Sequence, residues 1–191
     1  MVAMLEAGSA GMKRPLLAAL IAATVAAPTA HAATLADLVE QVDGGKSCWQ
    51  RVYEKTHLKN HPDQLVKSMT FGVEFHPHED PEPDDPGFSL FGMSVAMRDG
   101  RTGTTGGGCW IGEGGQLRCG VECDGGGVEL RMQPEGGLLI DLEATGYIRM
   151  EGECGGGTED ATFPLEPGLD DKRFLLHPVD VAICEPLLPD W

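Results

Sequence analysis

The sequence predicts an all-β domain, an antiparallel sandwich or barrel of about eight short strands, with a short N-terminal helix and stapling disulfides. Three observations lead to this fold class. Apolar and polar residues alternate along several short segments, and turn residues separate these segments about every 8–12 positions. Glycine, with 27 copies in 191 residues, is well above its usual share of roughly 7%. Six cysteines supply an even number of thiols for pairing.

The beginning of the chain has the organisation of a secretory signal peptide. Lys13 and Arg14 precede an uncharged stretch, residues 16–27, and an Ala-x-Ala motif follows. A transmembrane anchor would need about 20 apolar residues, more than this alanine-rich stretch provides. We therefore expect residues 1–32 to be an N-terminal extension and cleaved signal peptide. Residues 33–191 would then form a single β-rich domain in the periplasm or outside the cell.

The cysteines are expected to form three disulfides, because an even count in an exported chain is typical of a disulfide framework. Two of them flank a Gly-Glu-Gly-Gly turn, so a hairpin there would place them opposite each other. Two others occupy equivalent positions of a weak internal repeat offset by 31 residues, and the last two would tie the ends of the domain together. Six cysteines permit 15 pairings, so the connectivity is a hypothesis. The predicted pairs are Cys48–Cys184, Cys109–Cys119 and Cys123–Cys154.

A short helix is expected directly after the signal peptide. Thr34 can cap its first turn, Asp37 brings favourable negative charge to that turn, and Gly44 is suited to follow its end. Residues 48–54 favour a strand. The polar stretch 57–64 contains a proline and is expected to be a loop or a single turn.

Alternation of apolar and polar side chains predicts the remaining strands. The clearest case is the segment that ends at Phe75, in which every second side chain is apolar. Turn residues such as Asp99-Gly100 separate one strand from the next. Segments expected to be strands are 65–75, 91–98, 102–110, 117–119, 128–132, 138–143, 147–151 and 173–177.

The chemically most distinctive stretch runs from His76 to Pro86. Two histidines one residue apart on an extended chain point the same way, and imidazoles followed by carboxylates suit zinc or copper. The alternative is an exposed acidic loop, kept extended by its four prolines, in which the histidines have no role. The candidate metal ligands are His76, His78, Glu79 and Asp80, to which His57, His61 and His177 are possible additions.

The charge and the missing motifs narrow the function. A formal net charge of −16 disfavours nucleic acid and anionic membranes as partners and favours a basic protein or peptide. The sequence contains no Gly-x-Ser-x-Gly, His-Glu-x-x-His or phosphate-binding P-loop motif. We therefore expect no cofactor other than the possible zinc or copper, and a non-catalytic protein is favoured over an enzyme.

Three segments resemble an uncharacterised family of small exported bacterial proteins. They are Cys-Trp-Gln-Arg-Val-Tyr at 48–53, His-Leu-Lys-Asn-His-Pro at 57–62 and Leu-Arg-Cys-Gly-Val-Glu-Cys-Asp-Gly-Gly-Gly at 117–127. The resemblance extends over most of the domain expected after cleavage. It implies export and a common fold, and it carries over no functional residues.

Three hypotheses of function follow. The first is a binding or interaction module for a protein or an envelope ligand. The second is a periplasmic metal-binding protein that uses the His-x-His segment. The third, an enzyme acting on cell-envelope carbohydrate, depends only on the abundant acids and on aromatic residues that could stack on sugars, although burial in the core is their alternative fate. Those aromatic residues are Trp49, Trp110 and Tyr147.

Overall fold

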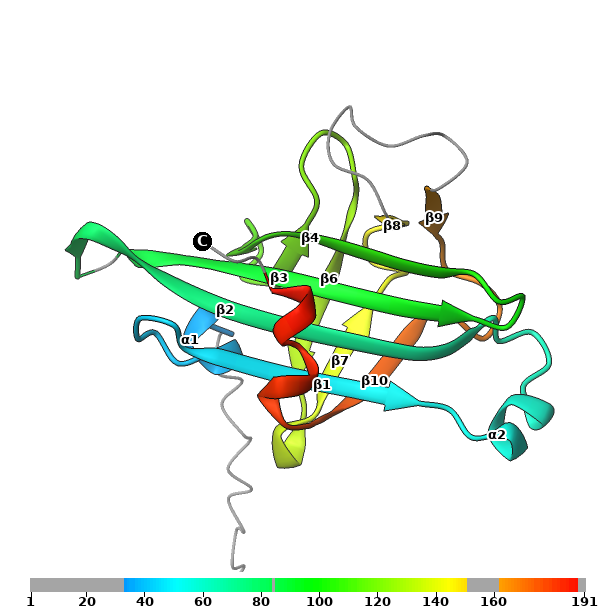
Figure 1. The fold of residues 1–191 in the computed structure, drawn as a ribbon. Helices are drawn as coiled ribbons and strands as arrows, with labels where there is room; N and C mark the ends of the chain where they lie inside the picture. Colours follow the sequence, from blue (N-terminus) through cyan, green and yellow to red (C-terminus); the bar gives the residue numbers. More distant parts are fainter. Residues whose placement is uncertain (1–32, 84, 151–161, 189–191) are drawn as a thin grey trace, which may run out of the picture. The chain divides into compact units, whose positions relative to one another are not determined.

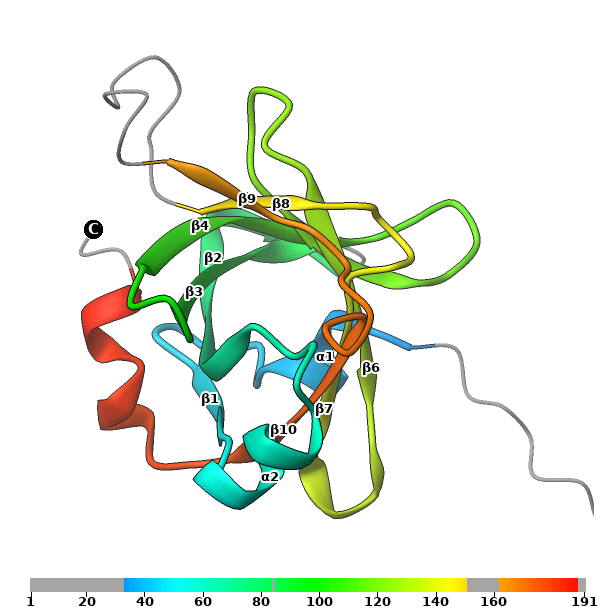
Figure 2. The same cartoon turned by 90° about the vertical axis from the view of Figure 1, so that its right-hand side faces the viewer.

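A computed structural model describes residues 33–83, 85–150 and 162–188. Eight antiparallel strands form a closed barrel in the order β1-β10-β7-β6-β5-β4-β3-β2, and β1 pairs with β2 to complete the ring (Figures 1 and 2). The all-β prediction is confirmed, and of its two forms the barrel is the one that occurs. The barrel strands are β1 (Lys46–Val52), β2 (Val66–Glu82), β3 (Asp85–Met97), β4 (Thr102–Ile111), β5 (Leu117–Gly120), β6 (Gly127–Met132), β7 (Leu138–Asp141) and β10 (Arg173–Pro178).

The remaining strands, β8 (Ile148–Met150) and β9 (Phe163–Leu165), pair with each other outside the barrel. An isolated bridge between Gly126 and Ile148 connects this small sheet to the loop before β6. The sequence predicts β8 but not β9, because three residues with a central proline give no alternation to detect. The predicted signal peptide and Cys154 lie outside the described residues.

The barrel interior is packed with side chains. Eight strands enclose a space just wide enough for side chains to fill, and the period-two alternation of each strand supplies them. Phe71 and Phe91 stack with their ring centroids 5.3 Å apart in this interior. The largest fully buried side chains are Phe71, Phe75, Phe91, Phe174, Leu38, Met69, Met93, Leu117, Leu130, Leu138, Ile140 and Leu142.

Two short helices flank β1. The first, α1 (Leu35–Leu38), has the predicted cap, since the Thr34 backbone N–H donates to Asp37 Oδ2 at 2.7 Å. It ends well before Gly44, because Val39 is extended and its side chain is buried in the core. The second helix, α2 (Lys55–Asn60), occupies the segment for which the sequence favours a loop or a single turn.

Two of the predicted disulfides are present in the structure, Cys48–Cys184 and Cys109–Cys119. Cys109 and Cys119 are register partners of the β4–β5 hairpin, as its glycine-rich turn predicts. The pairing of Cys123 with Cys154 stays a prediction, because Cys154 is not among the described residues. Cys48–Cys184 joins the first barrel strand to the segment that follows the last one.

That last segment contains the 3-10 helices η2 (Val181–Ile183) and η3 (Glu185–Leu187), which cross the outer face of β1, β2 and β3 (Figure 1). Gly72 and Gly92 are register partners beneath it. A Cβ at Gly72 would lie 2.7 Å from Cys184 Cβ, and one at Gly92 would collide with the Leu187 carbonyl oxygen. The absence of side chains at Gly72 and Gly92 therefore leaves the space in which the C-terminal segment packs against the barrel.

A row of opposite charges crosses the outer face of β5, β6, β7 and β10. Arg118, Glu129, Asp141 and Arg173 are successive register partners along this row. Arg173 Nε lies 2.9 Å from Asp141 Oδ2, and Arg131 Nη2 lies 2.8 Å from Glu129 Oε1. Because the two carboxylates are nearly buried, each needs these cationic partners to offset its desolvation.

We expect the long-range disulfide to stabilise the fold more than the short one. The two bonds span sequence separations of 136 and 10 residues, for which the chain-entropy relation gives about 5 and about 3 kcal/mol. Urea unfolding of the double variants Cys48→Ala/Cys184→Ala and Cys109→Ala/Cys119→Ala measures both losses. A greater loss from the Cys109–Cys119 variant would contradict this ranking.

We expect Gly92→Ala to lower the free energy of unfolding by about 1–3 kcal/mol, because the added methyl group collides with the backbone of Leu187. Gly108→Ala, in β4, is the matched control, since nothing lies within 4 Å of its added Cβ. The control should change stability by less than about 1 kcal/mol. Equal effects of the two substitutions, measured by urea unfolding, would show that Gly92 is not a packing constraint.

Candidate functional site

The two longest strands extend beyond the barrel as a two-stranded arm, which we define as residues 76–88. β2 pairs with β1 only as far as Glu74, and β3 pairs with β4 only from Ser89 onward. Beyond these positions β2 and β3 pair only with each other, from His76↔Phe88 to Glu82↔Asp85. The arm is the projection at the left of Figure 1.

The alternative of a loop at His76–Pro86 is wrong in its secondary structure, because residues 76–82 continue β2 and β3 begins at Asp85. Prolines are tolerated here since neither strand of the arm has a neighbour on its outer edge, and the pairing is irregular between Pro77 and Glu82. Gly87 has φ 158° and lies against the His76 carbonyl oxygen, so a side chain there would clash. The prediction of an extended and acidic segment is nevertheless correct.

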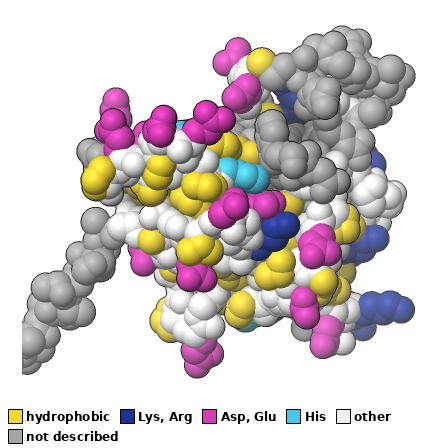
Figure 3. Space-filling model, turned by 60° about the vertical axis from the view of Figure 1, so that its left-hand side comes forward, with side chains coloured by type: hydrophobic (Ala, Val, Ile, Leu, Met, Phe, Trp, Pro, Cys, Tyr) yellow, Lys and Arg dark blue, Asp and Glu magenta, His cyan; other side chains and the backbone are white. Residues whose placement is uncertain are grey.

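The arm carries five acidic residues and no lysine or arginine. The described acidic side chains of the arm are exposed, and the face drawn in Figure 3 has acidic side chains spread across it, with most Lys and Arg toward its right-hand edge. Such a concentration of like charge produces a negative potential outside the barrel wall. These five residues are Glu79, Asp80, Glu82, Asp84 and Asp85.

The two histidines of the predicted metal site share one face of the arm. The rings of His76 and His78 lie 5.4 and 5.8 Å from the ring of Phe88, as their spacing along an extended strand predicts. His78 Nε2 is 3.3 Å from Asp85 Oδ1. In the part of the chain that the structure describes, no group of three or more His, Cys, Asp or Glu is arranged to hold a metal ion.

The other histidines are distant from the arm. His57 is in α2, and His61 is the residue that follows this helix. The helix lies at the end of β1 away from the arm (Figure 1). His177 is on β10, where its Nε2 lies 2.9 Å from Arg51 Nη1. The structure therefore does not bring these three residues together with His76 and His78, whose metal binding stays a prediction.

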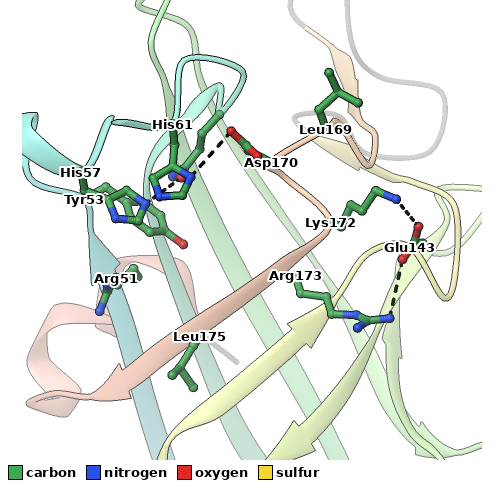
Figure 4. Close-up of a pocket in the computed structure, with 11 residues that line it drawn as sticks. Arg51, Tyr53, His57, His61, Glu143, Leu169, Asp170, Lys172, Arg173 and Leu175 are labelled. Carbon is green, nitrogen blue, oxygen red and sulfur yellow. Dashed lines mark hydrogen bonds and ion pairs between the residues drawn. The ribbon is translucent and has the colours of Figure 1, made fainter. Parts of the chain in front are cut away.

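A cleft opens at the seam between β1 and β10. These strands are register partners at only two positions, Trp49↔Pro178 and Gln50↔His177, and they separate beyond them. The resulting space has a volume of about 460 Å³. Figure 4 shows residues of β1 and α2 on one side of it and those of the 169–175 segment on the other.

One wall of the cleft is a stack of three rings. Tyr53 and His57 have centroids 4.9 Å apart, and His57 and His61 have centroids 4.4 Å apart with an interplanar angle of 19°. The four-residue spacing brings the two histidines over each other by one helical turn. His57 Nε2 also lies 3.0 Å from Gln64 Oε1, and His61 Nδ1 lies 3.7 Å from Asp170 Oδ2.

The charged groups of the cleft are mostly paired. Glu143 forms ion pairs with Lys172, whose Nζ lies 2.6 Å from Oε1, and with Arg173, whose Nη2 lies 3.6 Å from Oε2. Asp170 is the acidic neighbour of His61. Burial raises the pKa of Tyr53, and the nearby Arg51 guanidinium partly opposes this effect. The phenol of Tyr53 therefore stays neutral at physiological pH.

Asp171 fastens the segment before β10 to the start of β2. Its carboxylate accepts hydrogen bonds from the backbone N–H of Leu65 at 2.5 Å and of Val66 at 3.3 Å. Burial raises the pKa of Asp171, and these two hydrogen bonds oppose the rise. Neither Asp171 nor Arg51 is distinguished by a sequence motif, because their partners are distant along the chain.

The aromatic residues proposed as a sugar platform are not equivalent. Trp49 is buried, and its Nε1–H donates to the Gly136 carbonyl oxygen at 2.8 Å, so it closes one end of the core. Trp110 is 48% exposed on the outside of β4. Tyr147 donates its hydroxyl to the Asp124 carbonyl oxygen at 2.6 Å. For Trp49 the alternative of burial in the core is the correct one.

Searches among known protein families, curated proteins and solved structures find no match to the chain. Within the described ranges, no helix is both long and apolar enough to cross a membrane.

We expect the effect of Asp171→Asn to depend on pH. Because the pKa of Asp171 is raised in the folded state, the native protein binds more protons than the unfolded chain between the two pKa values. The stability that Asp171 contributes therefore falls as pH rises through that interval, whereas asparagine does not titrate. The loss of free energy of unfolding caused by the substitution should be larger at pH 3 than at pH 7, measured by urea unfolding. A loss that grows toward pH 7 would contradict the direction of the shift.

Proposed function

We propose that this protein is an exported, non-catalytic binding module that holds a basic protein or peptide through its acidic arm. One observation carries the proposal: the arm projects from the barrel with its described acidic side chains exposed and contains no lysine or arginine. A partner can thus approach the charges without meeting the barrel wall.

Electrostatics favours a basic partner for this element. Opposite charge speeds encounter and selects partners, whereas exposed charges separated by more than about 8 Å are largely screened at physiological salt. The four described acidic residues of the arm fall within seven positions of one hairpin, so they can act together on one partner. The formal charge of −16 of the whole chain adds to the attraction at low salt.

The arm also offers an apolar anchor. Phe88 is 43% exposed and contacts the rings of His76 and His78. Aromatic side chains surrounded by polar groups are common anchors in protein interfaces. Because β2 and β3 pair at the base of the arm and again at Glu82↔Asp85, the arm has a defined backbone before binding, which lowers the entropy that association costs.

Export is supported by the covalent structure. The disulfides Cys48–Cys184 and Cys109–Cys119 are of a kind that persists in oxidising compartments. Together with the signal peptide expected at residues 1–32, they favour the periplasm or the exterior of a bacterial cell.

The test compares two variants of equal charge. One replaces Glu79, Asp80, Glu82 and Asp85 of the arm by their amides. The control replaces four exposed glutamates outside the arm, whose neutralisation changes the net charge equally. The control positions are Glu40, Glu113, Glu122 and Glu166.

We expect a fluorescent decapeptide of alternating lysine and alanine to bind the unmodified protein at about 20 mM salt. The arm variant should raise its Kd at least tenfold and the control less than twofold, measured by fluorescence anisotropy. Equal losses would show that only net charge matters, and absence of binding by the unmodified protein would overturn the proposal.

Metal binding is a second candidate use of the arm, favoured by the two imidazoles on one face beside Asp85. If it occurs, calorimetric titration of the unmodified protein with Zn²⁺ or Cu²⁺ should show binding that His76→Ala/His78→Ala removes. Unchanged metal affinity in that variant would dispose of this candidate.

A further inference from the structure

We infer that the cleft between β1 and β10 binds a small organic carboxylate, with Arg51 as the residue that pairs with its anionic group. This site is separate from the arm, and its ligand is of the opposite charge to the partner proposed there. Three observations support the inference: Arg51 has no acidic partner, the cleft has the volume of a small-molecule site, and its rim is apolar.

Among the described residues, Arg51 is the cation of the cleft for which no counter-ion is present. Lys172 and Arg173 both pair with Glu143, and His61 faces Asp170. No carboxylate of the described residues lies within 4.0 Å of the Arg51 guanidinium. Because the chain has 30 acidic and only 14 basic residues, an arginine without an acidic partner is unexpected.

The guanidinium is also incompletely hydrogen-bonded. Its Nη1 lies 2.9 Å from His177 Nε2, which must be the acceptor because a guanidinium only donates. Its Nε is buried without a hydrogen-bond partner. A buried polar group without a partner costs free energy. A carboxylate ligand would supply the absent counter-ion, because a carboxylate can accept two hydrogen bonds from a guanidinium group.

The position of Arg51 follows from the strand geometry. It comes two residues after the core residue Trp49 and so belongs to the same face of β1. The pairing of β1 with β10 stops at Gln50, so the side chain of Arg51 enters the cleft instead of facing a neighbouring strand. Its Cζ lies 5.1 Å from the centroid of Tyr53, which holds it beside the ring stack.

The rest of the cleft suits an organic ligand. A volume of about 460 Å³ is within the range of roughly 300–1,000 Å³ typical of small-molecule sites. Leu169 and Leu175 line the cleft and are 76% and 43% exposed, so a ligand would bury apolar surface on both. The rings of Tyr53, His57 and His61 supply a flat wall on the opposite side (Figure 4).

The overall negative charge limits the size of the ligand's charge. A polyanion would be repelled by the 30 acidic residues, whereas a single carboxylate is recognised at contact distance by one arginine. A monocarboxylate with an apolar or aromatic body therefore fits the cleft best.

The test uses 4-phenylbutanoate and its uncharged analogue 4-phenylbutanamide as probes, followed by amide chemical shifts of the complete protein. We expect the carboxylate to shift amides of β1, α2 and residues 169–175, and the analogue to bind at least tenfold more weakly. Shifts confined to other parts of the barrel, or equal affinity for both probes, would overturn the inference.

Two arginine variants complete the test. Arg51→Gln should weaken binding of 4-phenylbutanoate at least tenfold, whereas Arg101→Gln, which removes the same charge outside the cleft, should weaken it less than twofold. Retained affinity in Arg51→Gln would also overturn the inference. If Arg51→Gln does not fold, the comparison of the two probes on the unmodified protein decides alone.

Discussion

The closure of the barrel at β1 is the constraint on which the rest of the structure depends. β1 pairs with β2 over its full length, from Lys46↔Glu74 to Val52↔Ser68, but with β10 at only two positions. Two register pairs form a short seam for a barrel wall. The Cys48–Cys184 bond adds a covalent connection at this seam, because it links β1 to the segment that directly follows β10.

Both candidate sites arise where neighbouring strands of the barrel differ in length, the cleft at the seam and the arm at the ends of β2 and β3. β1 continues beyond its last residue paired with β10, and there the wall opens so that Arg51 lines the cleft. β2 and β3 extend beyond the ends of their neighbouring strands, and these extensions form the acidic arm. The core itself is filled by aromatic and aliphatic side chains, so both candidate sites lie at these irregularities and not in the interior.

The sequence predicts those features that depend on neighbouring residues. The strand alternation ending at Phe75, the cap at Thr34 and the hairpin that pairs Cys109 with Cys119 all have local signals, and all occur. The extension of β2 through its prolines has no local signal, because it depends on pairing with β3. The sequence also does not predict the hydrogen bonds of Asp171 or the lack of an acidic partner for Arg51. Both depend on contacts of β1 or the start of β2 with the distant residues 171–177.

Removal of the whole arm tests the central claim most directly. Phe75 and Ser89 are register partners, so a two-residue Asn-Gly turn in place of residues 76–88 can close the shortened hairpin. The account predicts that the shortened protein keeps its cooperative thermal unfolding, with the midpoint changed by only a few degrees, and loses binding of the cationic peptide. A folded protein without the arm that binds the peptide as tightly as before would contradict the account.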